Sequence, residues 1–175
     1  MAPKVINFEK NKSKLMLILK DFNPQNILKE YKSYEELYNV FLHNFDIKNS
    51  QSPKNLWLGI TVENGNHLDR LEDLRHCPGW HFVSIEPCLD AVVLPNNPAD
   101  YLNWVIVGCE TGPGARIDEN TNKNIDSIVD QCLDARLPFW VKARAEYKNG
   151  KWTYTHDVPK ELRQYPEDWM KGGLK

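Results

Sequence analysis

Charged and polar side chains directly follow several short apolar runs of this sequence, and they are the strongest candidates for chemistry. Each run has the length of a β-strand, and in parallel α/β folds the ligand site lies where the strands end. Carboxylates at that edge could perform acid–base chemistry or hold Mg²⁺, and basic groups could neutralise them. The candidate ligand-binding residues are Glu63, Asn64, Glu86, Glu110, Thr111, Arg116 and Lys142.

These candidates have an alternative interpretation, because strand ends are often polar simply where they meet solvent. Three carboxylates and two strand-end basic segments share one position relative to their strands, which favours convergence if the sheet is parallel. None of these residues can be assigned as catalytic from the sequence.

The segment GCETGPGAR, residues 108–116, is the most informative of these strand ends. Its glycines allow a positive φ or a close approach of the backbone to a ligand, and its N–H groups could cradle an anion. No Lys-Ser/Thr pair follows, so it is not a Walker loop. Cys109 has no histidine nearby in the sequence to activate it, which favours a buried, inert thiol over a nucleophile.

The spacing of cysteines and histidines predicts no metal site and no cofactor. No two of the four cysteines lie two residues apart, and the five histidines form no HxH, HxxxH or HExxH set.

Five short apolar runs must position the candidates. They are almost continuously apolar, which is typical of parallel strands buried on both faces. The runs are Leu15–Lys20, Leu56–Glu63, His81–Glu86, Trp104–Gly108 and Phe139–Lys142.

Apolar residues at spacings of three and four predict helices between these runs. One or two helices are expected over residues 24–45, a short one near 68–74 and another near 125–133, whereas the connector 87–103 reads as a loop. The β and α elements alternate, so we expect an α/β fold. We expect one domain, residues 1–175, with a flexible N-terminus at 1–14 and a polar surface tail at 145–175.

Composition fits an ordinary globular domain, with 41% hydrophobic and 26% charged residues. The net charge of −2 gives no overall basic footprint for nucleic acid. Residues 1–54 hold nine lysines and six acids, a net +3, which could contact phosphate or form a solvated face. The apolar stretch LMLIL is too short for a signal peptide or a membrane span, so we expect a cytoplasmic protein without a membrane partner.

Four segments in fixed order, NLWLGITVEN, HFVSIEPCL, NWVIVGCETGPGAR and LPFWVKA, resemble a family of phage and bacterial proteins that are similar to radical-SAM enzymes and whose function is uncharacterised. The resemblance covers about residues 15–168. It implies a partial (half) TIM-like barrel with about five mainly parallel strands and flanking helices. It also implies that the seven candidate residues occupy the polar strand ends of that barrel.

The chain departs from the family pattern at several positions. Cys109 stands where the family has a glycine, Thr111 stands where it has a serine, and Ala-Arg-Ala follows Lys142 in place of Gln-Trp-Gly. Full-length members begin with a CxxxCxxC-type segment, whereas Met1–Asn23 contains no cysteine. Thiolates are needed to hold an iron–sulfur cluster, so this chain is not expected to be a radical-SAM enzyme by itself.

The resemblance favours a non-catalytic binding module derived from such a barrel. It would be phage-related and would act through a protein partner from host or phage, for example as an inhibitor of host machinery or defence. Trp152 and Trp169, in the polar tail, are the candidate partner-binding residues. Two alternatives stay open: an accessory subunit that completes a barrel with a cluster-bearing chain or with itself, and an enzyme acting on a phosphorylated or nucleotide-like ligand at the strand-end carboxylates.

The first prediction concerns metal. Protein purified without oxygen should be colourless and hold neither iron nor zinc in stoichiometric amounts, because the cysteine spacing offers no ligand set. Elemental analysis and visible absorption test this, and stoichiometric iron with visible absorbance would contradict it.

Overall fold

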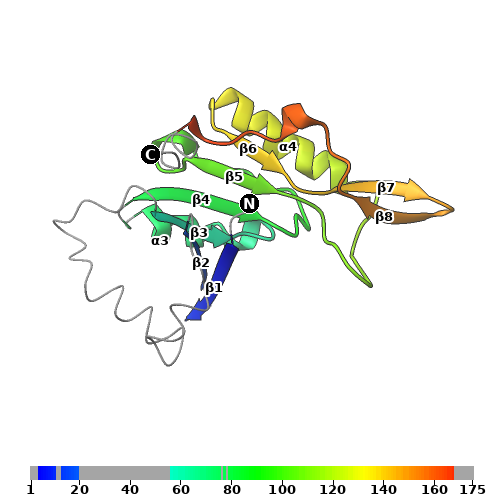
Figure 1. The fold of residues 1–175 in the computed structure, drawn as a ribbon, viewed down its shortest axis with the longest axis horizontal. Helices are drawn as coiled ribbons and strands as arrows, with labels where there is room; N and C mark the ends of the chain where they lie inside the picture. The colour runs from blue at the N-terminus through cyan, green and yellow to red at the C-terminus, as the bar shows by residue number, and fades with distance from the viewer. Residues whose placement is uncertain (1–3, 11–12, 20–55, 76, 78, 168–175) are drawn as a thin grey trace.

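The computed structural model describes residues 4–10, 13–19, 56–75, 77 and 79–167, and its centre is one six-stranded sheet (Figure 1). The strands lie side by side in chain order, and the last four are parallel to one another. Their bounds are β1 Lys4–Lys10, β2 Ser13–Leu19, β3 Leu56–Thr61, β4 Trp80–Ile85, β5 Trp104–Val107 and β6 Phe139–Val141. The α/β class is therefore confirmed. The described strands form an open sheet and no closed barrel, and the half-barrel stays a prediction.

The N-terminal strands differ from expectation. The run Leu15–Lys20 corresponds to β2, but β2 pairs antiparallel with β3, so the parallel part has four strands rather than five. Residues 1–14, expected to be flexible, include β1. Only two residues separate β1 from β2, a connection that suits an antiparallel pair and is far too short for a parallel crossover. The helical pattern at 24–45 lies outside the described residues.

Two helices cover one face of the parallel strands, as the apolar spacing predicts. They are α3, Asp69–Arg75, and α4, Thr121–Asp134. Their buried apolar side chains join the main core with alternate residues of each strand. Helix α4 ends at Asp134, before Pro138 could interrupt it. Arg136, just after the helix, takes a left-handed conformation with φ of 53°. The connector between β4 and β5, expected to be a loop, contains one 3₁₀ turn, η2, at Pro98–Asp100.

The opposite face of the same strands is aromatic. Trp57, Phe82 and Trp104 are buried there, and the rings of Trp57 and Trp80 stack with their centroids 5.6 Å apart. Side chains alternate across each strand, so residues two apart share this face. Gly59 lies directly under Phe82, and a Cβ at Gly59 would overlap the Phe82 ring. The aromatic layer therefore requires a glycine at position 59 in β3.

The outer edge of β6 is covered by residues near the C-terminus. The Gln164 amide donates to the Phe139 carbonyl at 2.8 Å, and the Arg163 guanidinium donates to the Val141 carbonyl at 3.3 Å. The Trp104 indole donates to the Gln164 carbonyl at 3.0 Å, which fixes the segment on the aromatic side. This edge consequently has partners from the chain itself.

The segment expected to be a surface tail holds regular structure instead. Strands β7, Arg144–Lys148, and β8, Lys151–Thr155, form an antiparallel hairpin that projects from one end of the molecule (Figure 1). The turn residues Asn149 and Gly150 both have positive φ, as a two-residue hairpin loop requires. A 3₁₀ turn, η3, follows at Lys160–Leu162.

In the part of the chain that the structure describes, no helix has both the length and the apolar character needed to span a bilayer.

The aromatic layer gives a stability prediction. Gly59→Ala should lower the free energy of unfolding by about 1–3 kcal/mol, because the new methyl group displaces the buried Phe82 ring. Urea unfolding measures this. Gly65→Ala is the matched control, because its nearest neighbour would be the Ala91 carbonyl oxygen at 3.7 Å. Equal effects of the two substitutions would contradict the packing described for Gly59.

Candidate functional site

The predicted strand-end carboxylates lie at one edge of the sheet. Glu63, Glu86 and Glu110 follow β3, β4 and β5, and these three strands are parallel neighbours. The loop after β4 ties this edge together: the Leu89 amide donates to the Glu63 carbonyl at 3.0 Å, and the Cys88 amide donates to the Gly108 carbonyl at 2.8 Å.

Glu86 reaches across a neighbouring strand to its cation. Lys142 Nζ lies 3.2 Å from Glu86 Oε1 and 3.3 Å from Oε2, and Ser84 Oγ donates to Oε2 at 3.3 Å. Lys142 follows β6, two strands away, a separation of roughly 10 Å between backbones. The path crosses Gly108, where a Cβ would lie only 2.9 Å from Glu86 Oε1. Gly108 thus makes room for a carboxylate and does not need a positive φ.

Glu63 pairs with a cation from a helix. Arg70, on α3, donates to Glu63 Oε2 at 3.0 Å and to the Thr61 carbonyl at 2.6 Å. Both the Arg70 and Glu63 side chains are largely buried. Asn64 accepts a hydrogen bond from the Asn66 amide at 2.9 Å and so caps the 3₁₀ turn η1, Gly65–His67. Both sequence-predicted candidates have structural partners here.

Glu110 holds the glycine-rich loop closed. Its carboxylate accepts from Arg116 Nε at 2.9 Å, from Arg116 Nη2 at 2.6 Å and from the Arg116 backbone amide at 2.6 Å. These hydrogen bonds lower the pKa of Glu110 from 4.5 to about 2. Gly112 and Gly114 have φ of 101° and 76°, so here the expected positive φ is found. Thr111 lies exposed beside them.

The candidates therefore share an edge without forming one charged cluster. Each carboxylate forms its ion pair with a different cation: Glu63 with Arg70, Glu86 with Lys142 and Glu110 with Arg116. The geometry neutralises each negative charge locally.

The four cysteines are free, and three of them are buried. Burial raises the pKa of Cys88 and Cys109 to about 11 and that of Cys132 to about 12. Burial also raises the pKa of Cys77. Within the described ranges, no three His, Cys, Asp or Glu side chains gather as metal ligands would. The expectation that Cys109 is buried is confirmed, since the residue is 3% exposed.

Two further residues of the site, Arg70 and Ser84, were not among the candidates predicted from the sequence. Arg70 lies on a helix, and residue spacing does not reveal how that helix packs against β3. Ser84 could have been predicted, because it precedes Glu86 by two residues and so shares its face of the sheet. Of the partner-binding candidates, Trp152 lies on β8, half-buried against the more exposed Tyr147, with ring centroids 5.2 Å apart. Trp169 lies outside the described residues.

The Glu110–Arg116 pair predicts a pH dependence. Because the pKa of Glu110 is about 2 when folded and near 4.5 when unfolded, its contribution to stability is complete above pH 4.5 and disappears as the pH falls toward 2. Glu110→Gln should therefore lower the melting temperature near neutral pH and change it little near pH 2. Thermal melts of both proteins across this range test the expectation. A constant difference at all pH values would contradict it.

Comparison with known proteins connects the chain to a family but to no described activity. No curated protein and no solved structure matches it. A family model described as a protein of unknown function, DUF5131, matches residues 5–168, which include every described strand and helix from β2 to η3. The chain therefore belongs to the DUF5131 family.

Proposed function

We propose that this chain is a non-catalytic binding module, related in origin to a radical-SAM-like half-barrel, that acts through a protein partner. The observation that supports this most is the separate neutralisation of the three strand-end carboxylates. A general acid or base works best with a pKa near the operating pH. Glu110 has a pKa of about 2 and a complete set of charge-assisted hydrogen bonds, which suits a structural role.

Nucleophilic chemistry has little support from the thiols. Cys109 lies at the strand-end edge, but burial raises its pKa to about 11, and a protonated thiol is a poor nucleophile. The enzyme alternative would need Glu86 or Lys142 to leave their mutual ion pair before either could act on a ligand.

The accessory-subunit alternative requires a free sheet edge for a second chain. Arg163 and Gln164 already bond to the carbonyls of β6, so a strand added there would have to displace them. This favours a module that is self-contained at the β6 edge over one that completes a barrel through it.

The hairpin β7–β8 is the best candidate for the binding surface. Tyr147 is 61% exposed at its tip, against Trp152, and exposed Tyr and Trp side chains are the commonest anchors of protein interfaces. The four free cysteines fit the reducing environment of the cytoplasm, where we place the protein. A partner from a phage or its host follows from the resemblance to phage proteins.

Removing the strand-end charges should affect stability and leave binding intact. The double substitution Glu86→Gln, Glu110→Gln breaks both ion pairs, so the melting temperature should fall by several degrees. Affinity capture from cells that carry the gene should still recover the same protein partner. A rise in melting temperature together with loss of the partner would instead assign the ligand site to the strand ends.

Removing the aromatic side chains of the hairpin should abolish binding and leave the stability of the core intact. Tyr147→Ala and Trp152→Ala should abolish capture of the partner while the core stays folded, because these rings lie beyond the main core. Leu133→Ala is the control, an exposed apolar side chain on α4. Capture that survives the hairpin substitutions, or that is lost equally with Leu133→Ala, would contradict the proposal.

A further inference from the structure

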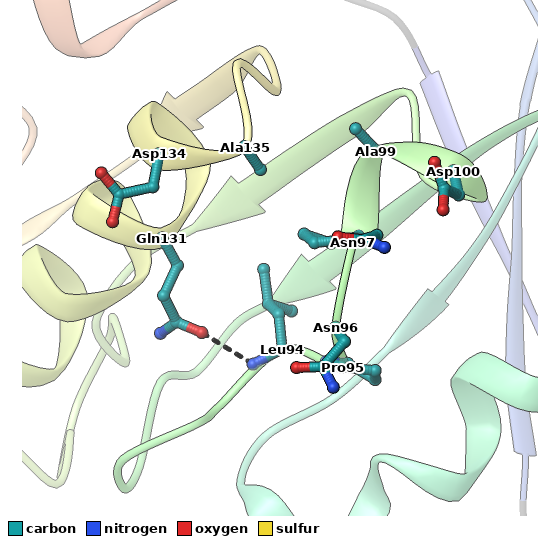
Figure 2. Close-up of a pocket in the computed structure, with 10 residues that line it drawn as sticks. Leu94, Pro95, Asn96, Asn97, Ala99, Asp100, Gln131, Asp134 and Ala135 are labelled. Carbon is teal, nitrogen blue, oxygen red and sulfur yellow. Dashed lines mark hydrogen bonds between the residues drawn. The ribbon is translucent and has the colours of Figure 1, made fainter.

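Helix α4 bonds to the backbone of its neighbours through amide side chains. Gln131, in the wall of a pocket between α4 and the loop that precedes β5, accepts from the Leu94 amide at 2.7 Å and donates to the Val92 carbonyl at 3.0 Å. Figure 2 shows the first of these bonds. Asn122 does the same for β7, since it donates to the Ala145 carbonyl at 2.9 Å and accepts from the Ala145 amide at 2.9 Å. The edge of β7 beside α4 is therefore closed at Ala145.

The Asn122 contact also shows which backbone groups of the hairpin point outward. Both backbone groups of Ala145 bond to Asn122, on the side away from β8. Opposite residues of an antiparallel pair either exchange both hydrogen bonds or exchange none, and the two kinds of pair alternate along the strands. Tyr154, opposite Ala145, therefore turns its N–H and C=O away from β7, and so does Trp152, two residues earlier.

The outer edge of β8 carries these outward groups. Among the described strands β8 pairs with β7 alone, and no described residue bonds to the outward backbone groups of Trp152 or Tyr154. Figure 1 shows β7 between α4 and β8, so the helix does not close this edge. An open strand edge is a template for pairing with another chain, and a two-stranded hairpin gains stability from a third strand.

One face of the hairpin is aromatic along this edge. Trp152, Tyr154 and Tyr147 share that face, because alternate residues of a strand point the same way and Tyr147 is opposite Trp152. The Tyr147 and Trp152 rings meet edge to face, with centroids 5.2 Å apart. Trp152 and Tyr154 are only half-buried, so apolar side chains on a neighbouring strand would cover them.

The other face of the hairpin is basic at the same edge. Lys151 and Thr153 lie on it, and Lys148 is directly opposite Lys151. Lys148 forms an ion pair with Glu146 at 3.0 Å, whereas Lys151 is exposed and has no ion pair in the part of the chain that the structure describes. An acidic side chain opposite Lys151 on a neighbouring strand would supply the missing charge.

We propose that the protein partner contributes an extended segment that pairs antiparallel with β8 as a third strand. Its backbone exchanges hydrogen bonds with Trp152 and Tyr154. Its side chains alternate, with apolar residues opposite Trp152 and Tyr154 and an acidic residue opposite Lys151. The backbone bonds supply affinity, and the alternating side chains supply specificity. This inference rests on the proposed function and names the chemistry that the hairpin recognises.

A short peptide of alternating glutamate and valine is the direct probe, with binding to the protein measured by fluorescence polarisation of the labelled peptide. N-methylation of the valines should weaken binding by about tenfold or more, because their N–H groups are the ones that bond to β8. N-methylation of the glutamates, whose N–H groups point away from β8, should leave binding unchanged. A peptide of the same composition, with its glutamates and valines in separate blocks, should bind as weakly as the valine-methylated one.

Charge reversal at Lys151 tests the contribution of the side chains. Lys151→Glu should weaken binding of the glutamate–valine peptide by about fivefold and favour a lysine–valine peptide instead. The variant should fold, because it places a negative charge opposite Lys148. Lys123→Glu, which changes an exposed lysine on α4, is the matched control and should bind like the unmodified protein.

No binding at millimolar peptide, or equal effects of the two N-methylations, would overturn the inference. If the peptide does not bind but a protein is still captured through Tyr147 and Trp152, the proposed function stands and only the way in which the partner is recognised is wrong. If neither peptide binding nor capture depends on the hairpin, both proposals fail.

Discussion

The strand-end edge of the sheet depends on one constraint: the Glu86 carboxylate must lie over Gly108 to reach Lys142. The three residues follow β4, β5 and β6, so the ion pair connects strands that do not touch. A Cβ at Gly108 would lie 2.9 Å from Glu86 Oε1 and 3.2 Å from the Ala143 backbone nitrogen, so the carboxylate would have to move from its place beside Lys142. The Lys142 side chain is 53% exposed and that of Glu86 is 18% exposed, so the pair is partly screened by solvent. The glycine that follows β5 and the ion pair between Glu86 and Lys142 therefore depend on each other.

The two faces of the sheet differ in the side chains that they carry. One face carries aliphatic residues against α3 and α4, and the other carries the aromatic layer of Trp57, Phe82 and Trp104. Strand alternation places Ser84 and Glu86 at the end of the aromatic face, next to Phe82. These polar groups thus lie at the end of the aromatic layer. Ser84 donates a hydrogen bond to Glu86, so the two side chains are partners where the neighbouring Phe82 ring offers none.

Much of this fold is predictable from periodicity, and the reasons for the failures are physical. The runs that became β3 to β6 are short and continuously apolar, and α4 has a clear stripe from Ile125 to Cys132. The direction of β2 is not predictable in this way, because an apolar run does not show whether the strand will pair parallel or antiparallel to its neighbour. The hairpin could have been predicted, since Asn149-Gly150 between two short runs is a strong turn signal. Residues chosen as a common site were predicted at the right edge, but their partners, Arg70 above all, depend on how a helix packs.

In the proposed function, the strand-end carboxylates serve the fold and recognition occurs elsewhere. A double-mutant cycle on Glu86→Gln and Lys142→Met, with stability measured by urea unfolding, tests this directly. We expect each single substitution to destabilise the protein and the two effects not to be additive, with a coupling of about 0.5–1 kcal/mol, as for a partly exposed pair. Additive effects, or a gain in stability from Glu86→Gln alone, would show that the carboxylate is not held for structure and would contradict this role.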